Sequence, residues 1–289
     1  MLAVVKRLAK NYILKRWGLD PKNPVKTFEF IVSSDYYKEL QNLLHIAKVK
    51  GFDLVRTGCE HDGGYIMLDD FHAGDIAYSF GISNDVSWDK DMASRGYDVF
   101  MYDHTIDSLP EENPRFHWSK LGIADGHTQD DRLKTLDDLI AQNHHENAHN
   151  MILKMDVEGA EWGFFEQVRS ETLSQFSQMT FEFHGIPTHP HPEQVLEIFR
   201  KINQTHQLVH VHANNNGNYV SFGHKKFCEL FELTYVLRSK YRFNDNYDVK
   251  LPLGIDETNI PSLPEIELGR WNDVCEIGSR ITAYVRYYI

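Results

Sequence analysis

The chain of 289 residues has few cysteines, no long apolar run and no excess of basic residues. Its three cysteines, Cys59, Cys228 and Cys275, are far apart and form no CxxC pair, so neither a disulfide framework nor a zinc ribbon is indicated and a reducing cytoplasm fits. No apolar run approaches the roughly 18 residues of a membrane span. The net charge of -12 argues against a general nucleic-acid-binding protein, which normally carries a basic stripe.

The remaining composition is that of an ordinary soluble globular protein, with 42% hydrophobic and 25% charged residues. We expect a helical extension over residues 1–50 and a single domain over residues 51–289, because no linker or repeat divides the chain. Residues 1–17 mix basic and apolar side chains and predict an amphipathic helix, whose charges interrupt any signal-peptide segment. This helix is expected to pack on the domain or on a partner subunit of a homo-oligomer. Peripheral contact with a membrane surface is the alternative.

The stretch MILKMDVEGAEW, residues 151–162, predicts a buried strand that ends in an acidic, glycine-containing turn. In open α/β sheets, ligands bind beyond the carboxyl ends of the strands. Asp156, together with Glu158 and Glu161, is therefore expected to face a site. The structural alternative is that these acids only begin and cap a helix, where the helix dipole favours carboxylates.

Other predicted βα units end in similar turns. One strand leads to Gly81 and Ser83, and the next ends in Asp103, at the position where such folds hold a ribose hydroxyl. A further turn contains Ala124 and Asp125. No GxGxxG motif is present, so the glycines that bind a pyrophosphate are missing, whereas the ribose-binding acid, Asp103, is retained. This combination favours a nucleoside ligand over a dinucleotide.

Two flanking segments add candidate residues. Upstream of the first core strand, a DGG sequence between apolar stretches predicts a hairpin, in which Arg56, Asp62 and Gly64 could grip a charged end of a ligand. Downstream, an alternating strand ends in His184, and the strand after the next helix places His212 on one face.

The ordered motifs RTGCEHDGGYIM, YSFGISNDVSWDKDM, VFMYDHT, LGIADG, LKMDVEGAEW and FEFH resemble those of the FkbM-like S-adenosylmethionine-dependent methyltransferases. The similarity covers roughly residues 54–215 and is most specific at DGGY and DVEGAEW. It implies an α/β fold with a Rossmann-like class I methyltransferase sheet of seven strands and helices on both faces. A helical N-terminal extension and an irregular C-terminal tail would be added to that fold here.

The resemblance also implies methyl transfer to a hydroxyl of a sugar or another small natural product. Several members serve bacterial capsule or polysaccharide assembly, so the expected acceptor is a nucleotide-linked or capsular-polysaccharide sugar. By position, Gly81 and Ser83 would lie beside the methionine part of S-adenosyl-L-methionine, and Asp103 would hold its ribose. Ala124 and Asp125 would flank the adenine. The expected cofactor-binding residues are thus Arg56, Asp62, Gly64, Gly81, Ser83, Asp103, Ala124 and Asp125.

The chemistry needs an activated hydroxyl, because a protonated alcohol is a poor nucleophile for in-line displacement at a sulfonium. A divalent cation can lower the pKa of the hydroxyl while it orients two neighbouring oxygens. We expect Asp156, His184 and His212 to be the catalytic residues and to converge as ligands of Fe(II), Mn(II) or Mg(II). Without a metal, His184 or His212 would be the general base, its neutral form being available near pH 7. The expected acceptor-binding residues are Glu158, Asn214 and Asn215.

Three alternatives stay open. An NAD-dependent sugar oxidoreductase fits the early βαβ unit, although GxGxxG and YxxxK are both absent. A non-haem iron oxygenase fits the two-histidine, one-carboxylate set, although such enzymes usually have an antiparallel barrel. A catalytically silent nucleoside-binding scaffold is the third. A nucleotide-sugar acceptor also predicts cations near its phosphates, for which the candidates are Lys225, Lys226, Arg238, Lys240 and Arg242.

Overall fold

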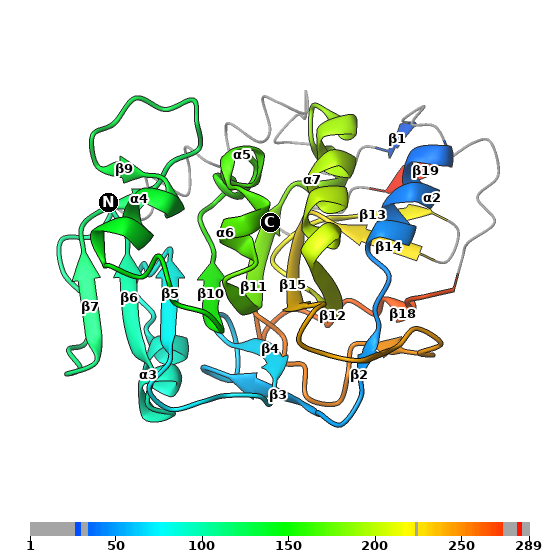
Figure 1. Cartoon of the computed structure of the whole chain (residues 1–289). Coiled ribbons are helices and arrows are strands. Elements are labelled where there is room, and N and C mark those ends of the chain that lie inside the picture. Colours follow the sequence, from blue (N-terminus) through cyan, green and yellow to red (C-terminus); the bar gives the residue numbers. More distant parts are fainter. Residues whose placement is uncertain (1–26, 30–33, 223–224, 274–281, 285–289) are drawn as a thin grey trace.

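The computed structural model describes residues 27–29, 34–222, 225–273 and 282–284, and its centre is a seven-stranded sheet (Figure 1). The strand order is β12, β15, β11, β10, β5, β6, β7, and β15 alone runs antiparallel to its neighbours. The bounds are β5 Ile76–Phe80, β6 Asp98–Tyr102, β7 Phe116–Ser119, β10 Met151–Met155, β11 Phe176–His184, β12 His206–Ala213 and β15 Leu230–Leu237. The predicted strands of the sheet are confirmed, and the mixed α/β architecture with them.

The helices are α2 Ser34–Leu43, α3 Ser87–Ser94, α4 Leu136–Gln142, α5 Glu161–Gln167, α6 Ser170–Leu173, α7 Pro192–Thr205 and the 3-10 turn η1 Ile186–Thr188. Two predicted helices are shorter than expected. The three- and four-residue spacing of Leu40, Leu43, Leu44 and Ala47 predicts a helix over residues 35–50, but the helix ends at Leu43 and Lys48–Val49 form strand β2 instead. The sequence also predicts a helix over residues 133–142, but it begins only at Leu136, because Thr135 caps it by accepting a hydrogen bond from the backbone N–H of Asp138 at 3.1 Å.

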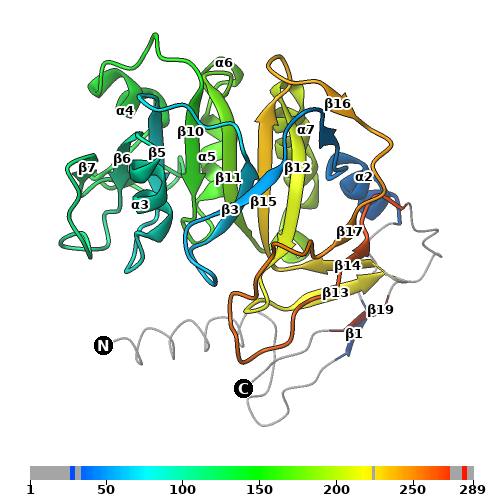
Figure 2. The ribbon, with the colours of Figure 1, turned by 90° about the horizontal axis from the view of Figure 1, so that it is seen from below.

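Short two-stranded sheets surround the central one. The predicted hairpin is confirmed as β3 Leu54–Thr57 paired with β4 Tyr65–Leu68, and Figure 2 shows β3 crossing in front of β11 and β15. The other pairs are β8 Gly122–Ile123 with β9 Leu133–Lys134, β13 Tyr219–Phe222 with β14 Lys225–Cys228, β2 with β16 Phe243–Asn244, β17 Lys250–Leu251 with β18 Gly269–Arg270, and β1 Thr27–Glu29 with β19 Thr282–Tyr284.

The apolar core is divided by the alternation of side chains along the central strands. In β10, Met151 and Leu153 belong to the large cluster that also contains residues of α2, α4, α5 and α7, whereas Ile152 belongs to a second cluster. That second cluster includes Trp88 and Met92 of α3. Because successive side chains of a strand point to opposite faces, the two clusters lie on the two faces of the sheet.

The chain after β17 is mostly irregular, as predicted, but it does more than wrap the surface. Residues 256–265 run beside the ends of β12 and β15, where Asn259 is buried and Asp256 and Glu265 contact side chains of β12. Within the described parts of the chain, no helix combines the length and apolar character needed to cross a bilayer. The amphipathic helix predicted at residues 1–17 lies outside the described residues.

Candidate active site

A cavity of about 430 Å³ lies at the carboxyl ends of β5, β6 and β10. Its lining includes Gly81 and Ser83 after β5, Asp103 after β6 and Asp156 after β10. Parallel strands end at the same edge of a sheet, which is why residues far apart in the sequence meet here. The structure therefore brings together the turn residues that the βα pattern singled out.

The turn after β5 is built on Gly81. Its φ of +76° is in the left-handed region, and a Cβ at this position would lie 1.6 Å from the backbone oxygen of Asp156. The next turn residue, Ser83, also has a positive φ, of +50°. Glycine at position 81 thus lets the turn approach the end of β10 and opens the cavity between them.

Asp103 holds this turn in place. One carboxylate oxygen accepts hydrogen bonds from the backbone N–H groups of Ile82 at 3.0 Å and Ser83 at 2.8 Å, and the other accepts from the backbone N–H and hydroxyl of Thr105 at 2.8 and 2.6 Å. Burial opposes ionisation of this group, but the hydrogen bonds together lower the pKa of Asp103 below its ordinary value. Its roughly four acceptor positions are all used within the protein.

Lys154 is a cavity residue that the sequence reasoning passed over. It belongs to β10 and is 6% exposed, and its Nζ donates a hydrogen bond of 2.5 Å to the backbone oxygen of Gly81. Nζ also lies 5.9 Å from the centroid of the Tyr65 ring. A lysine inside an otherwise apolar strand was the sequence feature that could have revealed it, because buried lysines are rare unless paired.

Asp156, Glu158 and His184 form a compact group at the edge of this cavity. His184 Nε2 lies 3.9 Å from Asp156 Oδ1 and 3.5 Å from Glu158 Oε2, and one potential ligand atom of each residue lies within 4.8 Å of the others. Glu158 reaches this position with a φ of +55°. Burial raises the pKa of Asp156, against the opposing effect of Lys154 and His184.

Glu161 orients His184 from the other side. Its side chain is fully buried, and its Oε1 accepts hydrogen bonds from the backbone N–H of His184 at 2.6 Å and from Nδ1 at 2.9 Å. Burial by itself disfavours a charged imidazole, but Glu161, Glu182 and Asp156 raise the pKa of His184 to about 10. The ring is therefore cationic near pH 7, in contrast to the neutral general base that the sequence suggested.

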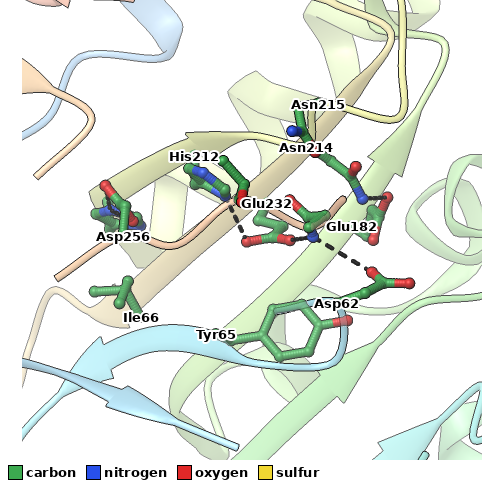
Figure 3. Close-up of polar contacts among 12 residues, drawn as sticks. Asp62, Tyr65, Ile66, Glu182, His212, Asn214, Asn215, Glu232 and Asp256 are labelled. Carbon is green, nitrogen blue, oxygen red and sulfur yellow. Dashed lines mark hydrogen bonds and ion pairs between the residues drawn. The ribbon is translucent and has the colours of Figure 1, made fainter. Parts of the chain in front are cut away.

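His212 lies in a different cluster (Figure 3). Pairing of β11 with β15 and of β15 with β12 places Glu182, Glu232 and His212 in one row across three strands. His212 Nδ1 lies 3.0 Å from Glu232 and Nε2 lies 3.4 Å from Glu265, so both ring nitrogens face carboxylates. The expected convergence of Asp156, His184 and His212 is therefore not what the described residues show: Asp156 and His184 lie close to Glu158, and His212 lies with other carboxylates.

Residues 72–219, more than half of the chain, match the family model of the methyltransferase FkbM domain. The chain belongs to the FkbM methyltransferase family. It is accordingly an enzyme of the methyltransferase type. No curated protein matches the chain.

The two asparagines expected to bind the acceptor of this methyltransferase make internal contacts. The amide nitrogen of Asn214 donates to Glu182 Oε1 at 2.9 Å. That of Asn215 donates to the backbone oxygens of Ile260 at 3.0 Å and Leu263 at 3.1 Å, while its side-chain oxygen accepts from the backbone N–H of Ile260. Asn215 thus fastens the C-terminal segment to the end of β12. Figure 3 shows the separate contact of Asn214 with Glu182.

The three hairpin residues have different positions in the methyltransferase. Arg56 donates to the backbone oxygens of Cys59 at 2.7 Å and His61 at 2.9 Å, so its guanidinium holds the loop between β3 and β4. A Cβ on Gly64 would lie 2.7 Å from that guanidinium and 2.1 Å from the oxygen of Cys59, which explains the glycine. Asp62 does line the cavity, where burial raises its pKa and the amide of Asn259 opposes the rise.

The turn of Ala124 and Asp125 lies beyond the lining of the first cavity, to which Gly122 and Ile123 contribute instead. Asp125 lines a second, more open cavity of about 640 Å³ that also includes His184. Glu158 lines both cavities. The Asp156, Glu158 and His184 group consequently stands where the two cavities of the methyltransferase adjoin.

Proposed function

We propose that this protein is an S-adenosyl-L-methionine-dependent O-methyltransferase that acts on a hydroxyl group of a sugar. In this proposal residues 51–289 form one Rossmann-like class I methyltransferase domain, and residues 1–50 extend it. The order of the seven strands and the reversal of β15 support this assignment. The cofactor occupies the first cavity and the acceptor approaches from the second.

The observation that carries the proposal is the charge of the first cavity. Its lining contains six carboxylates and a single lysine among the described residues: Asp62, Asp85, Asp89, Asp103, Asp156, Glu158 and Lys154. S-adenosyl-L-methionine supplies a methyl group on a cationic sulfonium, which such an acidic wall favours over an anionic ligand. A volume of about 430 Å³ is also in the range of small-molecule sites.

The same charge argues against the NAD-dependent oxidoreductase. A dinucleotide brings a pyrophosphate, which is normally held by a glycine-rich turn at a helix N-terminus. Here the lining offers no arginine and only one lysine, Lys154, among the described residues. A nicotinamide dinucleotide would therefore place its phosphates among carboxylates.

Individual residues receive specific roles in this proposal. Gly81 and Ser83 shape the turn beside the methionine part of the cofactor, and Lys154 offers the cation that its carboxylate needs. Asp103 fixes this turn. A ribose hydroxyl would reach Asp103 by replacing the hydroxyl of Thr105, since no acceptor position of the carboxylate is free.

Asp156, Glu158 and His184 would hold a divalent cation that helps to deprotonate the acceptor hydroxyl. Two carboxylates and an imidazole suit Mg(II), Mn(II) or Fe(II). The bond from His184 Nδ1 to the buried Glu161 carboxylate is the kind of outer contact that orients metal-binding histidines with Nε2 toward the ion. The cation would have to displace the proton of His184, so its affinity should rise with pH.

Calorimetric titration with S-adenosylhomocysteine, with NAD as the comparison ligand, tests the proposed function. We expect saturable binding of S-adenosylhomocysteine and none of NAD. Elemental analysis and Mn(II) titration of the same preparation test the metal site, and Asp156→Asn should weaken Mn(II) binding. Absence of S-adenosylhomocysteine binding, or tighter binding of NAD, would refute the proposed function.

A further inference from the structure

The second cavity adjoins the first at Glu158 and is the space from which an acceptor can reach His184. Its lining contains the carboxylates of Asp125, Glu158, Glu166 and Glu229, and among the described residues it contains no lysine or arginine. The basic groups in this lining are His127, His184, His189 and His191, and the cationic ring of His184 is paired with the buried carboxylate of Glu161. An acceptor thus enters past carboxylates.

Further carboxylates lie near His184 but outside the lining of both cavities, and among them Glu182 is 4.0 Å from Nε2. Glu182 and Glu232 are buried in the row across β11 and β15, and the amide of Asn259 lies between Glu232 and Asp62, with bonds of 2.6 and 3.3 Å. Asn259 is 3% exposed, and its side-chain oxygen accepts no hydrogen bond within the described residues. The second cavity thus has four carboxylates and no lysine or arginine in its described lining, with more carboxylates in the adjacent strands.

The basic residues that the sequence suggested for binding the phosphates of a nucleotide sugar lie outside both cavities. Lys225 donates to the backbone oxygens of residues 270 and 271, and Lys226 lies over the ring of Tyr219. Lys240 pairs with Asp70 at 2.9 Å. None of these three lysines lines either cavity, nor do Arg238 and Arg242.

We infer that the acceptor is a polyhydroxylated compound without phosphate groups, and that an amine-bearing acceptor such as an amino sugar is preferred over its neutral counterpart. The inference rests on the proposed function and narrows its substrate class. A phosphate would meet the like charges of four carboxylates at the entrance, which both slows association and opposes binding, whereas these carboxylates attract an ammonium group and can accept its hydrogen bonds. A divalent cation bound by Asp156 and Glu158 would offset those two carboxylates and leave the others.

The test uses the full chain saturated with S-adenosylhomocysteine, and three probes with the same ring: glucosamine, glucose and glucose 1-phosphate. Binding is followed by the NMR signal of the His184 ring at low and high salt. We expect glucosamine to bind about tenfold or more tightly than glucose 1-phosphate at low salt, with glucose between them and a smaller difference at high salt. Equal or tighter binding of glucose 1-phosphate would overturn the inference, and so would failure of glucosamine to bind.

A charge-reversal pair strengthens this experiment. Glu166→Lys places a cation in the lining of the second cavity and should raise the affinity for glucose 1-phosphate, whereas Glu171→Lys adds the same charge at an exposed position outside both cavities. Equal effects of the two substitutions would show that net charge, not the cavity, decides the preference. Failure of S-adenosylhomocysteine to bind would instead refute the proposed function, so the two failures are distinguishable.

Discussion

Removal of the charge at Glu161 should lower the pKa of His184. Glu161 Oε1 is the carboxylate oxygen closest to the His184 ring, at 2.9 Å, and the next carboxylates lie at 3.5 Å for Glu158, 3.9 Å for Asp156 and 4.0 Å for Glu182. Glutamine at position 161 keeps one oxygen, which can still accept from the backbone N–H of His184, but it gives up the ion pair and the second acceptor, which Gly159 uses. The pKa of about 10 in the parent protein should therefore fall.

The size of the fall follows from the interaction that is lost. A hydrogen bond to a charged group contributes about 1.5 to 3 kcal/mol, which corresponds to about one to two pH units. The folded-state pKa of His184 lies above the ordinary 6.5, so its charge stabilises the fold fully below pH 6.5, and this stabilisation is lost as the pH rises through about 10. In Glu161→Gln, the stabilisation from the charge of His184 should be lost at a lower pH than in the parent protein.

NMR titration of the metal-free protein measures this pKa directly, and thermal unfolding across pH 6 to 11 measures its effect on stability. Glu158→Gln is the matched control: Glu158 is 88% exposed, so solvent screens its charge and the pKa should change by less than about half a unit. A His184 pKa that stays near 10 in Glu161→Gln would refute the assignment of Glu161 as the group that keeps the ring protonated.

Three other substitutions probe the cavity and the core. Gly81→Ala should abolish S-adenosylhomocysteine binding through the contact with the Asp156 oxygen, whereas Gly74→Ala, with a similar φ of +94° and no atom within 4 Å, should cost only about 1 kcal/mol in unfolding free energy and keep binding. Asp103→Asn should weaken S-adenosylhomocysteine binding by about 1 to 3 kcal/mol in calorimetry, and unchanged affinity would remove Asp103 from the cofactor site. Burial lowers the pKa of His206 to about 4, so stability should decrease by up to about 3 kcal/mol as the pH falls from 6.5 to 4, and urea unfolding of His206→Gln should lack this decrease.

The parts of the fold that were predictable depend on short-range patterns. The mostly apolar run that begins at residue 151 and the glycine turn at residue 81 identified β10 and β5. The end of α2 was not predictable in this way. Residues 48–49 leave the helical pattern to pair with residues 243–244, a contact almost two hundred positions away in the sequence that no local pattern records.

The candidate site residues likewise include some whose positions follow from local patterns and some whose positions depend on distant contacts. Gly81, Ser83 and Asp156 follow the ends of parallel strands, so their convergence came from the order of the elements alone. The functions expected of Asn215 and His212 did not follow from that order. The side-chain amide of Asn215 and Nε2 of His212 contact residues 256–265, an irregular segment whose path carries no periodic signature.

The position of His212 depends on one additional residue in β12. The pairing of β12 with β15 shifts between Leu208 and His210, so that Leu208 faces Tyr235 while His210 faces Thr234. Without this shift the pairing would continue from Leu208 in steps of one, and His212 would face Phe231 instead of Glu232. A one-residue bulge reassigns every side chain beyond it to a new cross-strand partner. The bulge therefore places His212 opposite Glu232, at 3.0 Å, while its other ring nitrogen lies 3.4 Å from Glu265. These two carboxylates raise the pKa of His212 to about 10 despite its burial. His212 thus lies with its own carboxylates, and the residue that joins Asp156 and His184 is Glu158.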